Sequence, residues 1–242
     1  MTTRKPDWWM ELELRASQPP RASRRSLFLE GATAPVGSIE PALADAMRAA
    51  GMPLEARAQA EHVIGAPDAA LSRIAHWLSA QGLCGKWRNE LLAVTDESSM
   101  RHAVIERAAV RPLGIATFAV HLIGVTPQGD VWVQQRALDK ATDPGQWDTL
   151  VGGLVAADEG AALALERETW EEAGLRVSDL RLLAKADRIT VRRPVLEGYM
   201  VEHIGVFEAV MPVGVKPVNQ DGEVARFDCM KPDELTLQLA AG

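Results

Sequence analysis

The first 112 residues alternate between short apolar runs and stretches in which apolar residues recur every three or four positions. Alternating apolar and polar residues predict strands, and apolar residues at helical spacing predict helices. We therefore expect strands at 26–31, 35–39 and 86–94, and helices at 41–50, 66–81 and 98–110. Residues 1–25, with a Pro-Pro pair and the basic run RASRR, are expected to form a loosely ordered arm. This half of the chain is predicted to be a small α+β module.

From Gly114 onward the apolar segments become longer and surround one well-defined helical stretch. Strands are expected at 114–126, 131–136, 180–191, 198–211 and 223–230, and helices at 160–173 and 231–240. Asp158 suits the N-cap of the first helix, and Gly174 suits the position after its end. Its residues expected to face the core are Ala162, Leu165, Thr169 and Ala173. The order of elements predicts an α/β fold with a mixed sheet. We place a boundary between an N-terminal module, residues 1–112, and a second domain, residues 113–242.

The charged residues are unevenly distributed between these two parts. Residues 1–112 carry 14 Lys and Arg against 13 Asp and Glu, whereas residues 113–242 carry 12 against 20, a net charge of −8. This acid excess argues against a nucleic-acid partner, which requires a basic face. An acidic domain that handled an anionic substrate would need cations between the two, which is a first indication of a metal.

Composition also bears on where the protein acts. No apolar run approaches the roughly 20 residues that cross a bilayer, so no membrane partner is expected. Acidic residues interrupt the first sixteen positions, so we expect no secretory signal there. Cys84 and Cys229 are too few for a disulfide framework, and a reducing, cytoplasmic location fits best.

Three carboxylates crowd the end of the helix expected at 160–173. Glu168, Glu171 and Glu172 fall within an arc of about 100° and repel one another. A solvated acidic face is the ordinary explanation, but the C-terminal end of a helix disfavours negative charge. A preceding Gly-Gly turn also brings backbone carbonyls to the same place. A divalent cation would turn the repulsion into coordination, and Mg²⁺ is usually held by carboxylates together with substrate phosphates.

The spacing of the cluster is more specific than its charge. Gly153 is followed after five residues by Glu159, and after seven more by RETWEEAGL at 167–175. This arrangement resembles the Nudix box, the signature of hydrolases acting on a nucleoside diphosphate or another moiety linked through a diphosphate. One position departs from the pattern, because Thr169 stands where a bulky aliphatic residue is usual.

The resemblance implies a fold, a metal and a role for each motif residue. It implies a Nudix α/β/α sandwich with a mixed sheet, and Mg²⁺ as cofactor with Mn²⁺ as a substitute. The implied metal ligands are Glu168, Glu171, Glu172 and the carbonyl of Gly153. Arg167 would orient acidic neighbours such as Glu159. Glu168 is the first choice as general base.

A second candidate base lies further along the chain. In NQDGEVARF, Asp221 and Glu223 flank Gly222 immediately before a strand. An ordinary Asp-Gly turn explains this segment equally well. Because a downstream loop often supplies an extra ligand or base in this fold, we favour Glu223 as that residue.

A narrower resemblance covers most of the chain. It rests on the segments RRSLFLEG, WRNELLAV, IERAAVRPLGI, AVHLIGV, VWVQQRALDKATDPGQWDTLVGG and DGEVARFDCM. These are similar to the Nudix branch related to the module fused to fungal thiamine pyrophosphokinases. Members of that branch are implicated in converting thiamine diphosphate, or its damaged oxo and oxy forms, to the monophosphate. The resemblance implies a small-molecule diphosphate of this kind as the substrate.

Three residues in this region are candidates for binding that substrate. Arg136 and Lys140 suit contact with a diphosphate, although solvated surface charges are the ordinary interpretation. Trp147 suits stacking on a flat or cationic ring, although anchoring a loop or the core is commoner. Trp132 and Trp170 are expected to serve packing.

Alternative interpretations remain open at this point. ADP-ribose-type nucleotides are the alternative substrates of a hydrolase. An isopentenyl-diphosphate isomerase relative would share the loop K…PG.W, but its chemistry uses a Cys nearby and DTLVGGL has none. A non-catalytic Nudix sensor would be expected to have a degenerate motif, whereas this one is intact. A homodimer is left open, and the N-terminal module suits either a part of the substrate pocket or a dimer interface.

Overall fold

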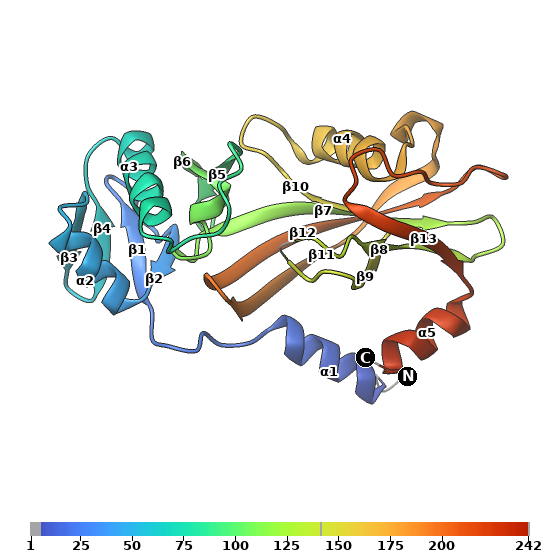
Figure 1. Cartoon of the computed structure of the whole chain (residues 1–242), viewed down its shortest axis with the longest axis horizontal. Coiled ribbons are helices and arrows are strands. Elements are labelled where there is room, and N and C mark those ends of the chain that lie inside the picture. Colours follow the sequence, from blue (N-terminus) through green and yellow to red (C-terminus); the bar gives the residue numbers. More distant parts are fainter. Residues whose placement is uncertain (1–5, 141, 242) are drawn as a thin grey trace.

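The computed structural model describes residues 6–140 and 142–241 (Figure 1). This described part of the chain forms a four-stranded, a two-stranded and a seven-stranded sheet. The elements before residue 112 are α1 (Asp7–Ala16), β1 (Arg25–Leu29), β2 (Gly37–Ile39), α2 (Pro41–Ala49), β3 (Leu54–Arg57), β4 (Ala60–Val63), α3 (Pro67–Ala80), β5 (Leu91–Thr95), β6 (Arg101–Glu106) and a 3-10 turn at Arg107–Ala109. Those after it are β7 (Ala116–Val125), β8 (Val131–Arg136), β9 (Trp147–Thr149), β10 (Val151–Leu154), α4 (Ala161–Ala173), a 3-10 turn at Val177–Asp179, β11 (Arg181–Val195), β12 (Gly198–Val210), β13 (Val224–Met230) and α5 (Pro232–Ala241).

The N-terminal elements form a small α+β unit with a sheet of its own. Its strands lie in the order β2-β1-β4-β3, with β1 and β4 parallel and the other neighbours antiparallel. Of the three helices expected here, those at 41–50 and 66–81 are present, and each begins with proline, at Pro41 and Pro67, where the missing N–H costs nothing. The predicted α+β module is therefore confirmed.

Residues 98–110 were expected to form a helix, and this prediction is wrong. The segment forms β6, which pairs with β5, and then the 3-10 turn. From His102 to Ile105 the burial alternates: Ala103 and Ile105 are buried, whereas His102 and Val104 are partly exposed. This is the two-residue period of a strand. Asp96 closes the hairpin, because its Oδ1 accepts hydrogen bonds from the backbone N–H groups of Ser98 and Met100, at 2.8 and 3.2 Å. This capped turn returns the chain alongside β5.

The C-terminal elements form one mixed sheet between helical layers. The strand order is β11-β12-β7-β8-β13, with β10 paired to β7 and β9 paired to β8. The β12–β7 pair is parallel and the others are antiparallel. Helix α4 covers one face, while α5 and α1 lie together on the opposite side (Figure 1). The predicted α/β fold with a mixed sheet is confirmed.

The predicted arm contains one helix in its described part. Residues 1–5 of it lie outside the described residues, and α1 follows at 7–16. The chain after α1 joins the edge of the large sheet, where Gln18 N donates to Arg192 O at 2.7 Å. Tyr199 Oη donates to Gln18 O at 2.8 Å. Among the described residues, no helix is long and apolar enough to cross a membrane.

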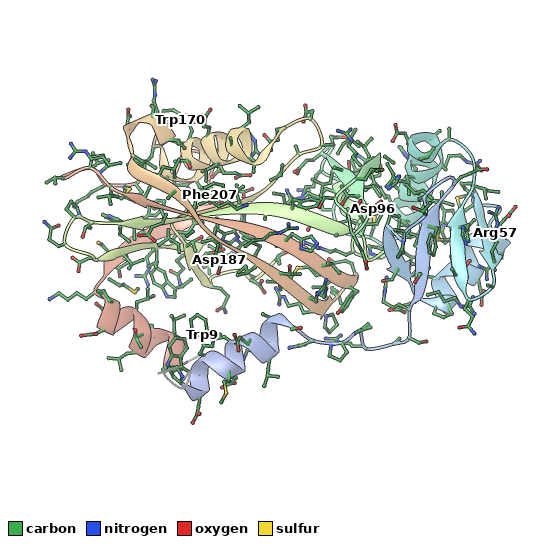
Figure 2. The ribbon with its side chains drawn as sticks, turned by 180° about the vertical axis from the view of Figure 1, so that it is seen from behind. Trp9, Arg57, Asp96, Trp170, Asp187 and Phe207 are labelled. Carbon is green, nitrogen blue, oxygen red and sulfur yellow. The ribbon has the colours of Figure 1, made fainter. Side chains whose placement is uncertain are left out.

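The described residues bury two hydrophobic clusters that meet near residue 115. The first cluster runs from Leu27 to Ile115 and the second begins at Val120. Phe207 of β12 packs against the second cluster (Figure 2). The boundary that we place at 112/113 lies close to this change of core, although Leu113 still belongs to the first cluster.

Helix α4 begins one residue later than expected, and it buries three of the four residues expected to face the core, namely Leu165, Thr169 and Ala173. Its N-cap is Gly160, and no side chain among the described residues caps it, so the prediction of Asp158 is wrong. Its buried residues are Ala164, Leu165, Thr169, Glu172 and Ala173. Ala162 is exposed, so the prediction that it faces the core is also wrong. Gly174 ends the helix as predicted, with φ of 64°. A side chain there would also crowd Val218 O, at 2.8 Å from the Cβ.

Candidate active site

Helix α4 presents two carboxylates to the backbone of β10. The helix packs on β10 and β7, and the side that carries Glu168 and Glu172 faces Gly152 and Gly153. Positions 168 and 172 are one helical turn apart, so both side chains project in the same direction. Trp170 lies on the opposite side and is 49% exposed (Figure 2), so the expectation that it serves packing is wrong.

Glycine at position 153 makes room for Glu168. A Cβ at this position would overlap Cδ and Oε1 of Glu168, so any other residue would displace the carboxylate. The Glu168 side chain is only 12% exposed. Burial raises its pKa, and the charges of Glu171 and Glu223 raise it further, whereas Arg167 opposes the shift. This carboxylate therefore sits in an environment that disfavours its charge.

Glu172 is more deeply buried than any other carboxylate of the helix. The residue is 1% exposed, and its Oε2 accepts hydrogen bonds from Gly152 N and Gln134 Nε2, both at 2.9 Å. Burial raises the pKa of Glu172 to about 7, although these two hydrogen bonds favour the charged form. The Oε1 of Gln134 is buried without a hydrogen-bond partner in the described part of the chain. Glu172 and Gln134 thus form a buried polar pair between α4 and the sheet.

Arg167 ties the helix to the loop before it. Its Nη2 donates to Glu159 Oε1 at 2.6 Å and to Leu154 O at 3.1 Å, and its Nε donates to Glu159 Oε2 at 3.2 Å. Its Nη1 donates to Glu168 at 2.8 Å and to Glu171 at 3.1 Å. The hydrogen bond from Arg167 lowers the pKa of Glu159. The structure therefore brings Arg167 to the acidic neighbours that the sequence pattern pairs with it.

The carboxylates suit a divalent cation in chemistry, although they do not yet converge on one point. Within the described ranges, no group of three or more His, Cys, Asp or Glu side chains is arranged as a metal cluster. Arg167 lies between Glu168 and Glu171, and Glu172 is turned toward Gly152. However, burial raises the pKa of Glu168 and of Glu172, so the charged form of each carboxylate is disfavoured by its surroundings. A cation bound there would compensate that charge.

Glu223 approaches this group from the start of β13. Its side chain forms an ion pair with Lys140, and its charge contributes to the raised pKa of Glu168. Burial is the largest influence on Glu223 and raises its pKa, but Lys140, Arg107 and Arg88 together lower it below the ordinary value. Glu223 and Lys140 thus lie at the same site, whereas Asp221 stays in the preceding turn, accepting from Glu223 N at 2.8 Å.

The other candidate substrate-binding residues have partners within the protein. Arg136 donates to Thr142 O at 3.0 and 3.2 Å and to Asp148 Oδ2 at 3.2 Å, so it holds the loop between β8 and β9. Trp147 on β9 is 37% exposed, and the guanidinium of Arg226 lies 5.0 Å from its ring centroid. Trp147 therefore keeps an accessible aromatic surface, and Arg136 serves first to shape its loop.

Sequence reasoning missed the residues that support the helix from the sheet. Gln134 anchors Glu172, and the ring of His121 lies over Gly152, 2.9 Å from where a Cβ would stand. His121 Nδ1 is also 2.9 Å from Thr149 Oγ1. Nothing in the pattern VWVQQR distinguishes Gln134 from Gln135 as the buried one, so only the sheet reveals it.

With this geometry in view, the family can be assigned. Residues 116–242 match the model of the NUDIX domain, which covers just over half of the chain. The chain belongs to the Nudix family. The resemblance seen in the motif is confirmed at this level, and the matched region begins with β7 and contains all the carboxylates described above.

Curated relatives support the same assignment. The chain is 37% identical over 92 residues to the uncharacterized Nudix hydrolase PA4841 of Pseudomonas aeruginosa, covering 38% of this chain and 54% of that protein. It is 32% identical to the chloroplastic Nudix hydrolase 24 of Arabidopsis thaliana, covering 65% of this chain and 44% of that protein. It is 30% identical to an isopentenyl-diphosphate Delta-isomerase of Streptomyces coelicolor, over 60% of this chain and 73% of that protein. The chain spans about half the length of the first two relatives.

A solved structure supports the fold. The crystal structure of DR0079 from Deinococcus radiodurans aligns with a TM-score of 0.51 at 23% identity, covering 63% of this chain and 90% of that chain. The Nudix fold of the C-terminal part therefore agrees with known structures.

Proposed function

We propose that the protein is a Mg²⁺-dependent Nudix hydrolase that cleaves a diphosphate linkage in a small organic diphosphate. The observation that carries this proposal is the pair Glu168 and Glu172, one turn apart and buried against the Gly152–Gly153 backbone within an intact motif. A solvated acidic face would leave both side chains in water. Burial of two carboxylates is costly unless something compensates their charge.

The metal would be held by the residues that the motif marks. These are Glu168, Glu171, Glu172 and the Gly153 carbonyl, with Mn²⁺ as a substitute for Mg²⁺. Such a cation, when bound, neutralises phosphate oxygens and lowers the pKa of a coordinated water.

The chain's own side chains supply positioning and proton transfer. Arg167 is joined to Glu159 through both nitrogens of one edge, which fixes the last turns of α4 relative to the loop after β10. Glu168 remains the first choice to accept a proton from the attacking water, because it is largely buried and its pKa is raised despite the contact with Arg167. Glu223 is the second choice, and its ion pair with Lys140 keeps it ionised.

Thiamine diphosphate or its oxo and oxy derivatives are the substrates that we favour. The support is the segment-by-segment resemblance to the thiamine-related branch, together with the exposed ring of Trp147 beside the Gly-Gly strand. A flat heterocycle could stack there, and a cationic ring would compete with Arg226 for the same aromatic face. We propose no nucleic-acid or membrane partner and, from the low cysteine content, a cytoplasmic location.

The isomerase alternative lacks the cysteine that its chemistry uses near the loop. The chain's two cysteines are Cys84, in the loop between α3 and β5, and Cys229, near the end of β13. The charged groups that perturb the Cys84 thiol are Glu106 and Glu197, and those around Cys229 are Asp130 and Asp228. Neither set includes the carboxylates of α4, so we rank hydrolysis above isomerisation.

The proposal is tested by a substrate screen with Mg²⁺. Thiamine diphosphate, its oxo and oxy forms, ADP-ribose, dinucleotides and isopentenyl diphosphate are incubated with the protein, and phosphate-containing products are followed by chromatography. We expect thiamine monophosphate or its oxo or oxy analogue, and no product from Glu172→Gln. Cleavage of nucleotides only would refute the substrate, and no cleavage of any compound would favour a ligand sensor.

A further inference from the structure

A cavity of about 340 Å³ lies where the N-terminal module meets the Nudix domain. The N-terminal side includes Lys86, Arg88, Arg107 and Arg111, and the Nudix side includes the end of the β11–β12 hairpin at 193–197. This hairpin reaches toward the N-terminal module (Figure 1). Tyr199 N donates to Arg111 O at 3.0 Å, so the two walls are joined by the backbone.

The cavity is strongly cationic although the chain as a whole has a net charge of −7. The charged residues among its described lining are Lys86, Arg88, Arg107, Arg111 and Arg193 against Asp143 and Glu197. Arg111 is paired with Glu202 at 2.8 Å, and Arg193 with Asp143 at 2.6 Å. Within residues 6–140 and 142–241, Lys86 and Arg88 enter no ion pair, and both are exposed. Arg107 is paired with Glu90 at 2.7 Å. An anion entering this cavity would therefore meet the Arg88 guanidinium and the Lys86 ammonium, which no carboxylate of the described residues pairs.

The cavity adjoins the carboxylates of the Nudix site. Leu154 lines it, and this residue follows Gly153 and accepts a hydrogen bond from Arg167 at 3.1 Å. The charges of Arg107 and Arg88 also act on Glu223 and oppose the effect of burial on its pKa. Arg88 and Arg107 therefore line the cavity and also act electrostatically on Glu223.

Buried and backbone contacts fix the segment that carries these basic residues. Glu106, which is 4% exposed, accepts from Arg88 N at 2.8 Å. Glu90 O accepts from Arg107 N at 2.8 Å, and the Glu90 carboxylate accepts from Arg107 Nη1 at 2.7 Å. Asn89 takes a left-handed conformation, with φ of 57°, which turns the chain between them. The backbone at Arg88 and the side chain of Arg107 are thus held in place at the wall of the cavity.

We propose that this cavity binds the terminal phosphate of the substrate, with Arg88 and Arg107 as specificity-determining residues supplied by the N-terminal module. The inference rests on the proposed function and names the substrate class as an organic monoester of diphosphate. A terminal phosphate carries a charge of about −1.5 to −2 near pH 7, whereas a bridging phosphate carries a single charge. A cationic cavity therefore favours a terminal phosphate over a bridging one. Arg88 should contribute most to this preference, because no carboxylate partner competes for its guanidinium.

Binding of methylenediphosphonate, a non-hydrolysable diphosphate mimic, tests the inference by calorimetry with Mg²⁺. Loss of one charge-assisted contact should weaken binding roughly ten- to hundredfold in Arg88→Gln and in Arg107→Gln. Arg73→Gln, an exposed arginine on α3 outside the cavity, is the matched control and should bind as the wild type does. Arg88→Gln is the decisive variant, because its side chain has no ion pair in the described structure whose loss could unfold the module.

Kinetics separate this inference from the proposed function. Arg88→Gln should raise KM for thiamine diphosphate far more than KM for ADP-ribose, whose phosphates are bridging, with kcat little changed. If wild type hydrolyses thiamine diphosphate but Arg88→Gln leaves both KM and mimic binding unaltered, the cavity proposal is overturned and the hydrolase survives. If no compound is hydrolysed but the mimic binds in an Arg88-dependent way, the proposed function fails and the cavity survives. Failure of the wild type to bind the mimic overturns the cavity proposal.

Discussion

Glu172→Gln should make the metal-free protein more stable at alkaline pH, because it removes a buried charge and keeps the shape of the side chain. The residue is 1% exposed, and its Oε2 accepts from Gly152 N and Gln134 Nε2. A glutamine oxygen can accept the same two hydrogen bonds. The substitution therefore isolates the effect of ionisation from the effect of packing.

The magnitude follows from the raised pKa of Glu172. Burial lifts this pKa from 4.5 to about 7, and each pKa unit corresponds to about 1.36 kcal/mol, so the difference is about 3 kcal/mol. The folded protein holds the proton to a higher pH than the unfolded chain does. The stabilising contribution of the protonated carboxyl is therefore fully present below about pH 4.5 and is lost as the pH rises through about 7. Glutamine does not titrate, so the variant escapes this loss.

Urea denaturation in EDTA at pH 5 and pH 8 measures the effect. The advantage of Glu172→Gln over wild type should grow by about 2–3 kcal/mol between the two pH values. Glu166→Gln, an exposed carboxylate on the same helix, should show no such growth. At pH 8, Mg²⁺ should stabilise the wild type and not Glu172→Gln. Equal pH dependence of stability in wild type and Glu172→Gln would refute the claim that burial raises the pKa of the Glu172 carboxyl in the metal-free protein.

Other predictions follow from contacts at the same site. Glu171→Gln and Glu172→Gln should each lower Mg²⁺-dependent turnover by about a hundredfold or more while circular dichroism is unchanged, since each removes a ligand charge and no core volume; full activity in either would contradict its assignment. Gly153→Ala should lower turnover by roughly tenfold or more by displacing Glu168, whereas Gly160→Ala, with open space at its Cβ, should remain active; equal rates would show that Glu168 tolerates displacement. Lys140→Gln should shift the acidic limb of the pH–rate profile to higher pH, because Glu223 would lose the partner that opposes the effect of burial on its pKa. The exposed Lys216→Gln is the control, and an unshifted limb would remove Glu223 from the reaction.

Much of the fold and of the motif can be predicted from the sequence, because both rest on short-range patterns. The alternation of apolar residues predicts most strands, and the spacing from Gly153 to Gly174 marks α4. The expectation of a turn at Gly152 and Gly153 is wrong, because both lie within β10 and pair with β7. Residues 98–110 were predicted wrongly because their apolar residues fit both periods, and the hairpin closed by Asp96 decides between them. The hairpin of β3 and β4 was missed because its strands are short and its turn has no glycine, only Ala58 with φ of 53°.

Only the tertiary structure separates the three carboxylates of α4 from one another. Glu171 and Glu172 are adjacent and chemically identical, yet the side chain of the first is 42% exposed and the second residue is 1% exposed. The difference comes from Gln134 and Gly152, on strands that pack under one side of the helix. Arg88, more than sixty residues before the motif, likewise lines the cavity together with the end of the β11–β12 hairpin, and its backbone N–H donates to Glu106. The sequence by itself determined the Nudix family, because a motif encodes its own spacing. The burial, pairing and charge environment that tune each group were decided by contacts between distant segments, which local pattern does not encode.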